Sequence, residues 1–137
     1  MLIRLIQRIP SSLRILAATL WALAIPAASL LPAHFFSHTP ELDRFPHADK
    51  FVHAALYGVL TGLWLWRAPD PATMRRCSFI AAAATAYGLL MEGLQCFTPS
   101  RSMDLTDALA NALGAFLVAG VALVIGRKRQ QRPLRTE

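Results

Sequence analysis

Charged residues are scarce in this 137-residue chain: they make up 16% of the sequence, whereas hydrophobic residues make up 55%. A soluble domain usually carries about 25% charged residues. The high hydrophobic content also excludes an intrinsically disordered chain, because the chain has ample apolar surface to bury. Two cysteines are too few for a small domain that is held together by disulfides. The composition therefore indicates a protein that places its apolar surface in a membrane.

The two cysteines, Cys77 and Cys96, are not expected to form an intrachain disulfide. Both lie in one predicted helix, where their spacing places them about 28 Å apart at the helical rise. A disulfide requires Cα atoms within about 7 Å of each other. The cysteines therefore say nothing about the redox compartment.

Basic residues outnumber acidic ones, which gives a formal net charge of +6. In a soluble protein this excess would suggest nucleic-acid binding, but the basic residues form a few short clusters and no basic patch with interspersed aromatic residues is present. We therefore expect no nucleic-acid partner. The clusters are better explained by orientation in a membrane.

Four segments are long and apolar enough, or nearly so, to cross a hydrocarbon core about 30 Å thick as helices. They cover about residues 13–31, 51–66, 77–97 and 105–125, and the second is the shortest. The connections between them have lengths typical of a helical bundle. We predict an all-α, four-helix transmembrane bundle that forms a single domain over residues 1–137.

The amino terminus has a pattern of its own. Leu2, Leu5, Ile6 and Ile9 share one helical face, which predicts a short interfacial helix before Pro10. The first span could instead be a cleaved signal peptide, because basic residues precede an apolar run that ends in small residues. That run is longer than the usual signal core of about 7–15 residues, so we favour a retained span.

Lys and Arg residues are distributed unequally between the two sides of the predicted bundle. One side has eleven, and these are Arg4, Arg8, Arg14, Arg67, Arg75, Arg76, Arg127, Lys128, Arg129, Arg132 and Arg135. The other side has only Arg44, Lys50 and Arg101. Because cytoplasmic loops carry the excess of Lys and Arg, both termini are predicted to face the cytoplasm.

Polar residues gather at the predicted outer ends of three spans, at a depth where they are costly and therefore informative. Asp49, His53 and Tyr57 share one helical face, because they are spaced i, i+4, i+8. We expect one outer-leaflet pocket, whose candidate ligand-binding residues are Asp49, Lys50, His53, Tyr57, Glu92, Gln95, Arg101, Asp104, Asp107 and Asn111.

Small residues would let these three helices approach one another closely. Pairs at the spacing of helix-packing motifs occur in each of them: Gly58 and Gly62, Ala84 and Gly88, Ala110 and Gly114. Such pairs are common by chance in alanine-rich spans, but here they lie on or near the polar faces.

Simpler structural roles remain open for several of the polar residues. Asp49 and Asp104 could be helix N-caps, His53 and Tyr57 could anchor a helix at the membrane interface, and Asn111 could form an interhelical hydrogen bond. Glu92 differs, because a buried carboxylate must be neutral or paired. For Glu92 we favour a functional or network role.

Three motifs occur in order along the chain. They are Asp49-Lys50-x2-His53-x3-Tyr57, Tyr87-Gly88-x3-Glu92-x2-Gln95 and Pro99-Ser100-Arg101-Ser102-x-Asp104-x2-Asp107-x3-Asn111-x2-Gly114. This region, 49–114, resembles the VanZ-like family of bacterial membrane proteins. The resemblance implies a four-helix domain in the bacterial inner (cytoplasmic) membrane and, through the founding member, a link to resistance to the glycopeptide teicoplanin. It implies no particular reaction.

We favour a binding function over catalysis. In this hypothesis the pocket binds an envelope lipid, a cell-wall precursor or a glycopeptide, with Lys50 and Arg101 near anionic groups and Glu92 among the hydrogen-bonding residues. Membrane lipids are the expected partners, no cofactor is expected and the oligomeric state stays open. A purely structural polar network is a further alternative.

The alternative is a membrane-embedded hydrolase or transferase that acts on an envelope lipid headgroup. Its catalytic candidates are His53 as general base and Glu92 or Asp107 as acid or metal ligand. The segment from Ser100 to Asn111 has the spacing of a lipid-phosphatase motif but lacks the nucleophilic histidine, so we expect no phosphohistidine. We assign no metal site, because the remaining histidines, His34, His38 and His47, lack a recognised ligand spacing.

Overall fold

The computed structural model describes residues 9–30, 47–67, 72–98 and 103–131, and these contain no β-strand. They form four helices, α2 (Ser11–Leu30), α3 (Ala48–Arg67), α4 (Met74–Gln95) and α5 (Leu105–Gln130). The predicted all-α fold is confirmed. The predicted interfacial helix at the amino terminus lies outside the described residues.

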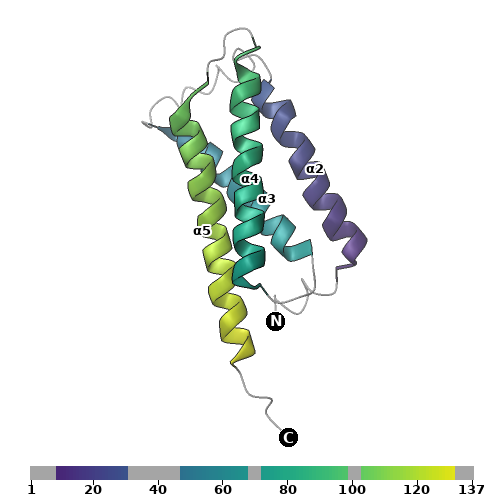
Figure 1. Ribbon diagram of the computed structural model, residues 1–137. Coiled ribbons are helices and arrows are strands. Elements are labelled where there is room, and N and C mark those ends of the chain that lie inside the picture. Colours follow the sequence, from purple (N-terminus) through teal and green to yellow (C-terminus); the bar gives the residue numbers. More distant parts are fainter. Residues whose placement is uncertain (1–8, 31–46, 68–71, 99–102, 132–137) are drawn as a thin grey trace, which may run out of the picture.

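Consecutive helices run in opposite directions (Figure 1). Helix α3 packs most extensively against α5, and α4 also packs against α5. Helix α2 contacts α3 and, to a smaller extent, α4. The three helices that carry the polar residues therefore form the centre of the bundle, and α2 leans against them.

Three helices are long and apolar enough to cross a membrane: α2, α4 and the part of α5 from Leu105 to Lys128. Three of the four predicted segments thus form helices with the length and composition of a membrane span. Helix α3 is as long as α2, but its first turns contain Asp49, Lys50 and His53, which lower its hydropathy. That α3 crosses the membrane stays a prediction.

The helices extend beyond the apolar segments from which they were predicted. Helix α4 begins at Met74, after Thr73, whose hydroxyl accepts a hydrogen bond from the backbone N–H of Arg76 at 3.3 Å. Helix α5 continues through the basic residues to Gln130. Each added residue gains a backbone hydrogen bond, so an apolar run marks where lipid contact is expected and not where a helix ends.

Glycines let α3 and α5 approach to backbone contact. A Cβ atom placed on Gly114 would lie 1.9 Å from the carbonyl oxygen of Ala54, and one placed on Gly58 would lie 3.3 Å from the carbonyl oxygen of Gly114. On α4, a Cβ at Gly88 would lie 2.9 Å from Nδ2 of Asn111. Small residues at these three positions are therefore required for the observed packing, as small-residue motifs in membrane helices predict.

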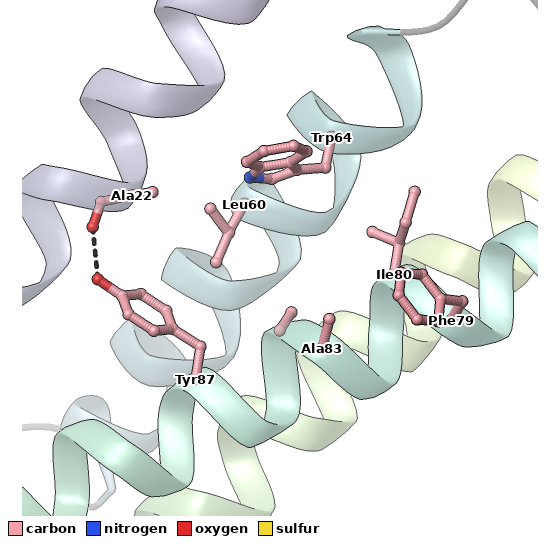
Figure 2. A pocket seen from close by; sticks show the side chains of 8 residues that line it. Ala22, Leu60, Trp64, Phe79, Ile80, Ala83 and Tyr87 are labelled. Atoms are coloured by element: carbon pink, nitrogen blue, oxygen red, sulfur yellow. Dashed lines mark hydrogen bonds between the residues drawn. The ribbon is translucent and has the colours of Figure 1, made fainter.

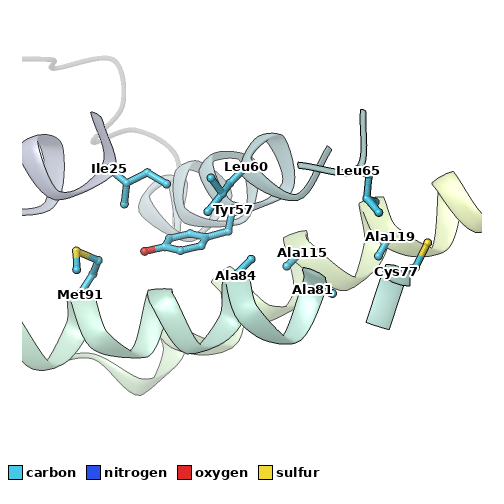
Figure 3. Close-up of a cluster of buried hydrophobic side chains, with 10 residues drawn as sticks. All are labelled: Ile25, Tyr57, Leu60, Leu65, Cys77, Ala81, Ala84, Met91, Ala115 and Ala119. Atoms are coloured by element: carbon cyan, nitrogen blue, oxygen red, sulfur yellow. The ribbon is translucent and has the colours of Figure 1, made fainter. Parts of the chain in front are cut away.

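Half of the ten side chains in the buried apolar core are small, namely four alanines and a cysteine (Figure 3). Its members are Ile25, Tyr57, Leu60, Leu65, Cys77, Ala81, Ala84, Met91, Ala115 and Ala119. Cys77 is buried and Cys96 is exposed, and both are free thiols, as predicted. Alanines at the helix contacts keep the axes close, which in turn lets polar side chains from different helices meet.

Two basic residues cap the carboxyl end of α3. The Arg14 guanidinium donates a hydrogen bond to the carbonyl oxygen of Trp66 at 3.1 Å, and Arg76 donates to the carbonyl oxygen of Leu65 at 2.5 Å. The last carbonyls of a helix lack partners within the helix and attract cations. These arginines therefore provide hydrogen-bond donors to the last carbonyl groups of α3, in addition to any effect on the orientation of the protein in a membrane.

Candidate functional site

Three helix ends meet at one end of the bundle: the start of α3, the end of α4 and the start of α5 (Figure 1). They bring together seven residues that we call the polar cluster. It consists of Asp49, Lys50, His53, Glu92, Asp104, Asp107 and Asn111.

Lys50 is at the centre of the outer part of the polar cluster. Its Nζ lies 3.0 Å from Oδ2 of Asp49 and 2.8 Å from Oδ2 of Asp104, and it also contacts Oδ1 of Asp107. A lysine ammonium has three N–H donors, and each has a carboxylate here. Lys50 therefore has no free donor left for an anionic ligand.

These contacts shift the pKa values of Lys50 and Asp104. Burial acts to lower the pKa of Lys50, but hydrogen bonds with Asp104, Asp107 and Asp49 outweigh it and raise that pKa above its usual range. The hydrogen bond from Lys50, followed by those from Thr106, holds the pKa of Asp104 well below its usual range. Lys50 and Asp104 are therefore both charged at neutral pH.

Asp104 also caps α5, one of the simpler roles that the sequence allowed. Its Oδ1 accepts hydrogen bonds from the backbone N–H of Thr106 at 2.8 Å and from the Thr106 hydroxyl at 2.7 Å. The other carboxylate oxygen binds Lys50. Asp104 thus fixes the start of α5 and joins it to α3.

His53 lies between residues of the other two helices. Its Nδ1 is 3.0 Å from Oδ1 of Asn111 and 3.7 Å from Oε1 of Glu92, and its Nε2 is 3.6 Å from Oδ2 of Asp107. Only the contact with Asn111 is within hydrogen-bonding distance. Because an amide oxygen is an acceptor, this bond places the proton of a neutral imidazole on Nδ1.

Glu92 is the most deeply buried acid of the polar cluster, with 1% of its side chain exposed, compared with 15% for Asp107. Its Oε2 accepts a long hydrogen bond, 3.5 Å, from the backbone N–H of Asp104. Among the described residues, His53 is the only basic side chain recorded within 4 Å of this carboxylate. Glu92 is thus a buried acid whose recorded side-chain contacts, with the Asp104 backbone and with His53, are 3.5 Å or longer.

Two of the other predicted site residues, Tyr57 and Gln95, are not part of the polar cluster. Tyr57 is one helical turn deeper than His53, where its side chain is buried and its hydroxyl has no hydrogen-bond partner. Gln95 instead donates a hydrogen bond to the carbonyl oxygen of Ser29 on α2, at 3.1 Å. Arg101 lies outside the described residues.

The polar cluster contains a set of side chains with the geometry to hold a metal ion. His53, Glu92 and Asp107 each offer one ligand atom, and these atoms lie within 4.8 Å of one another. The three residues come from three different helices. The same set was singled out in the sequence as candidate catalytic residues, and the fold brings them together.

An apolar groove of about 310 Å³ lies between α2, α3 and α4 (Figure 2). At one end, the Tyr87 hydroxyl donates a hydrogen bond to the carbonyl oxygen of Ala22 at 2.7 Å. The lining residues are Ala22, Leu60, Trp64, Phe79, Ile80, Ala83, Ala84 and Tyr87. Sequence reasoning missed this groove, because apolar residues in a membrane span carry no signal that separates a groove from a flat lipid-facing surface.

Comparison with known proteins supports the resemblance seen in the motifs. The chain matches the VanZ/LLP1 family over residues 5–126. No curated protein matches the chain, and no solved structure matches it. The matched region includes all four described helices except the last residues of α5.

Proposed function

Because the chain belongs to the VanZ/LLP1 family and has helices apolar enough to cross a membrane, we propose that it is a membrane-embedded binding protein. Its ligand site is the polar cluster, and its ligand is an envelope lipid, a cell-wall precursor or a glycopeptide. The observation that carries this proposal is the meeting of polar residues from three helices at one end of the bundle, two of which, α4 and α5, are apolar enough to cross a membrane. Such residues are costly in a membrane unless they serve a function.

The charge of the polar cluster narrows the ligand chemistry. The cluster contains four carboxylates, from Asp49, Glu92, Asp104 and Asp107, but only one ammonium group, and that group already contacts three of them. The cluster therefore favours hydrogen-bond donors and cationic groups. An amine or a set of hydroxyl groups, as on a glycopeptide or an aminated headgroup, fits it better than a phosphate does.

The substitution Glu92→Gln tests this function, because it removes a carboxylate charge and preserves the size of the side chain. We expect binding of teicoplanin to the purified protein in detergent, measured by calorimetry, to weaken at least about tenfold, since a charged hydrogen bond contributes about 1.5–3 kcal/mol. Cells that express the variant should lose any teicoplanin protection that the unmodified protein confers.

The matched control is Cys96→Ser, an exposed position one helical turn from Glu92. This variant should bind teicoplanin as the unmodified protein does. Equal binding by the Glu92→Gln protein, expressed at the same level, would remove the main support for a ligand site in the polar cluster.

A second candidate function is hydrolysis or group transfer on an envelope lipid headgroup. The observation that favours it is the position of the His53 imidazole between Glu92 and Asp107, because histidine next to carboxylates is a common acid–base arrangement. Purified protein incubated with a phospholipid and a lipid-linked cell-wall precursor should then release the headgroup, and His53→Gln should abolish the release. If no headgroup is released from either substrate, the catalytic function is contradicted and the binding function is favoured.

We also propose that both termini face the cytoplasm and that the polar cluster lies in the outer leaflet of the bacterial inner membrane. Arg14, Arg67, Arg76 and Lys128 lie at helix ends that point away from the polar cluster. Cytoplasmic ends of membrane helices are enriched in such residues. The apolar groove lies in this inner half, where it would accept an acyl chain of a membrane lipid.

A further inference from the structure

The facing atoms of His53 and Asp107 are both acceptors when the imidazole is neutral. The hydrogen bond to Asn111 places the imidazole proton on Nδ1, so the lone pair of Nε2 points into the space shared with Oδ2 of Asp107, at 3.6 Å. Two acceptors at this distance repel each other unless a proton or a metal cation lies between them. A positive charge between Nε2 of His53 and Oδ2 of Asp107 would therefore remove this repulsion.

The separation of the two atoms fits a shared cation better than a direct hydrogen bond. A hydrogen bond between nitrogen and oxygen spans about 2.7–3.2 Å, which is shorter than the observed distance. Two ligand atoms that are each about 2.1 Å from a tetrahedral zinc ion are about 3.4 Å apart. Glu92 on α4 offers a third carboxylate, and one ligand atom from each of His53, Glu92 and Asp107 lies within 4.8 Å of the other two.

The neighbours of the three residues resemble the second coordination shell of a metal site. A metal-bound histidine usually donates its other ring N–H to an oxygen, which fixes the tautomer and the ring orientation, and Asn111, which is 1% exposed, has this position. Lys50 binds Oδ1 of Asp107 and leaves Oδ2 for the cation. The backbone N–H of Asp104 holds the second oxygen of Glu92.

A buried polar group one helical turn from His53 is an independent indication that a ligand belongs here. The Tyr57 side chain is 1% exposed, and its hydroxyl has no hydrogen-bond partner among the described residues. The hydroxyl points toward the side of the core where Met91 lies, next in sequence to Glu92 (Figure 3). Three protein ligands leave a fourth position of a tetrahedral zinc open, and a group bound there would offer the hydroxyl a partner.

Charge balance leads to the same conclusion. When its acids are ionised and His53 is neutral, the polar cluster contains four negative charges and one positive charge. The carboxylates of Asp49 and Asp104 are largely exposed to solvent, but those of Glu92 and Asp107 are mostly buried, where uncompensated charge is strongly unfavourable. A divalent cation would reduce the net charge of the cluster from three negative charges to one.

We propose that His53, Glu92 and Asp107 bind one divalent transition-metal cation, for which zinc is the best fit. His53 coordinates through Nε2, and the two acids coordinate through one carboxylate oxygen each. The cation ties α3, α4 and α5 together at the ligand-binding end of the bundle. This inference does not depend on the proposed ligand, because it concerns residues of this chain alone.

The test is a zinc titration of the purified full chain in detergent, after treatment with a chelator and without teicoplanin. We expect one zinc ion per chain, and a loss of affinity of at least about 100-fold in Glu92→Gln and in His53→Ala, since each removes one of three ligands. Asn111→Ala should weaken zinc binding about 10- to 100-fold through the second shell. His47→Ala, an exposed histidine outside the polar cluster, should bind zinc normally.

Helical content and elution volume, measured on each variant, separate lost ligands from lost folding. If His53→Ala does not fold, the zinc affinity of the isosteric Glu92→Gln protein tests the proposed site. Zinc bound in less than one-to-one ratio by the unmodified chain would overturn the proposal, and so would unchanged affinity in folded Glu92→Gln protein. In either case a proton would be the charge between His53 and Asp107, and teicoplanin binding would remain a separate question.

Discussion

Replacing Gly114 with alanine is expected to destabilise the protein by at least about 3 kcal/mol. The added methyl group would lie 1.9 Å from the carbonyl oxygen of Ala54 and 2.6 Å from its carbonyl carbon. Backbone atoms cannot rotate out of the way as a side chain can, so α3 and α5 must move apart. The free energy of unfolding in mixed micelles, measured by titration with a denaturing detergent, reports the loss.

The same separation should also disrupt the polar cluster. Ala54 follows His53 on α3, and Gly114 lies one turn after Asn111 on α5, so moving the helices apart breaks the hydrogen bond between His53 and Asn111. Zinc affinity should therefore fall together with stability in Gly114→Ala.

Gly120→Ala is the matched control on the same helix. A Cβ atom there would meet nothing within 4 Å, and alanine is favoured over glycine in a helix by up to about 1 kcal/mol. We expect this variant to be as stable as the unmodified protein or more stable. If both alanine variants unfold alike, the close contact between α3 and α5 is not what holds the bundle together.

Removing the Lys50 ammonium with Lys50→Met is expected to cost about 2 kcal/mol of unfolding free energy. The methionine fills a similar volume, but Asp107, whose side chain is 15% exposed, loses its cation. The contacts with Asp49 and Asp104 add little, because both carboxylates are largely exposed to solvent. Stability is measured by the same detergent titration.

Lys128→Met is the control for removal of a positive charge. Lys128 is exposed near the end of α5, far along the chain from the polar cluster, so its replacement should change stability by less than about 0.5 kcal/mol. Equal stability of the two methionine variants would mean that the contacts of Lys50 with the three carboxylates do not stabilise the folded protein.

The Lys50→Met protein should also respond differently to acid. The pKa of Asp104 is lowered in the folded protein, first of all by its hydrogen bond with Lys50. The stabilisation from this shift is complete above the unfolded pKa of about 4 and is lost as the pH falls through the lower folded pKa. The unmodified protein should therefore lose more stability than the variant as the pH falls below about 4.

Much of the site could be predicted from sequence, because helical periodicity fixes which residues share a face. The i, i+4 spacing placed Asp49 and His53 on one face of a helix, and the alternating directions of successive spans placed them at the same end as Glu92 and Asp107. Seven of the ten predicted ligand-binding residues meet in the polar cluster. Their role in ligand binding stays a prediction.

Other features could not be predicted, because they depend on distances between helices. Gln95 lies on the same helix as Glu92, but it contacts α2. Nothing in the sequence distinguishes a lysine that meets an anionic ligand from one whose three donors are already used, as those of Lys50 are. The metal site that we propose departs from the sequence-based expectation for the same reason, since its ligands have no recognised spacing along the chain.

The sequence by itself determined that this is an all-α protein with membrane-spanning helices and polar residues at one end, because hydropathy and helical period are properties of single segments. Only the tertiary structure decided which polar atoms face each other. The approach of α3 to α5 at Gly114 sets the distances from His53 to Asp107 and Asn111, and such distances follow from packing. The four acidic residues in the described part of the chain thus form one compact cluster with Lys50, and the chemistry of that cluster depends on separations of a few ångströms.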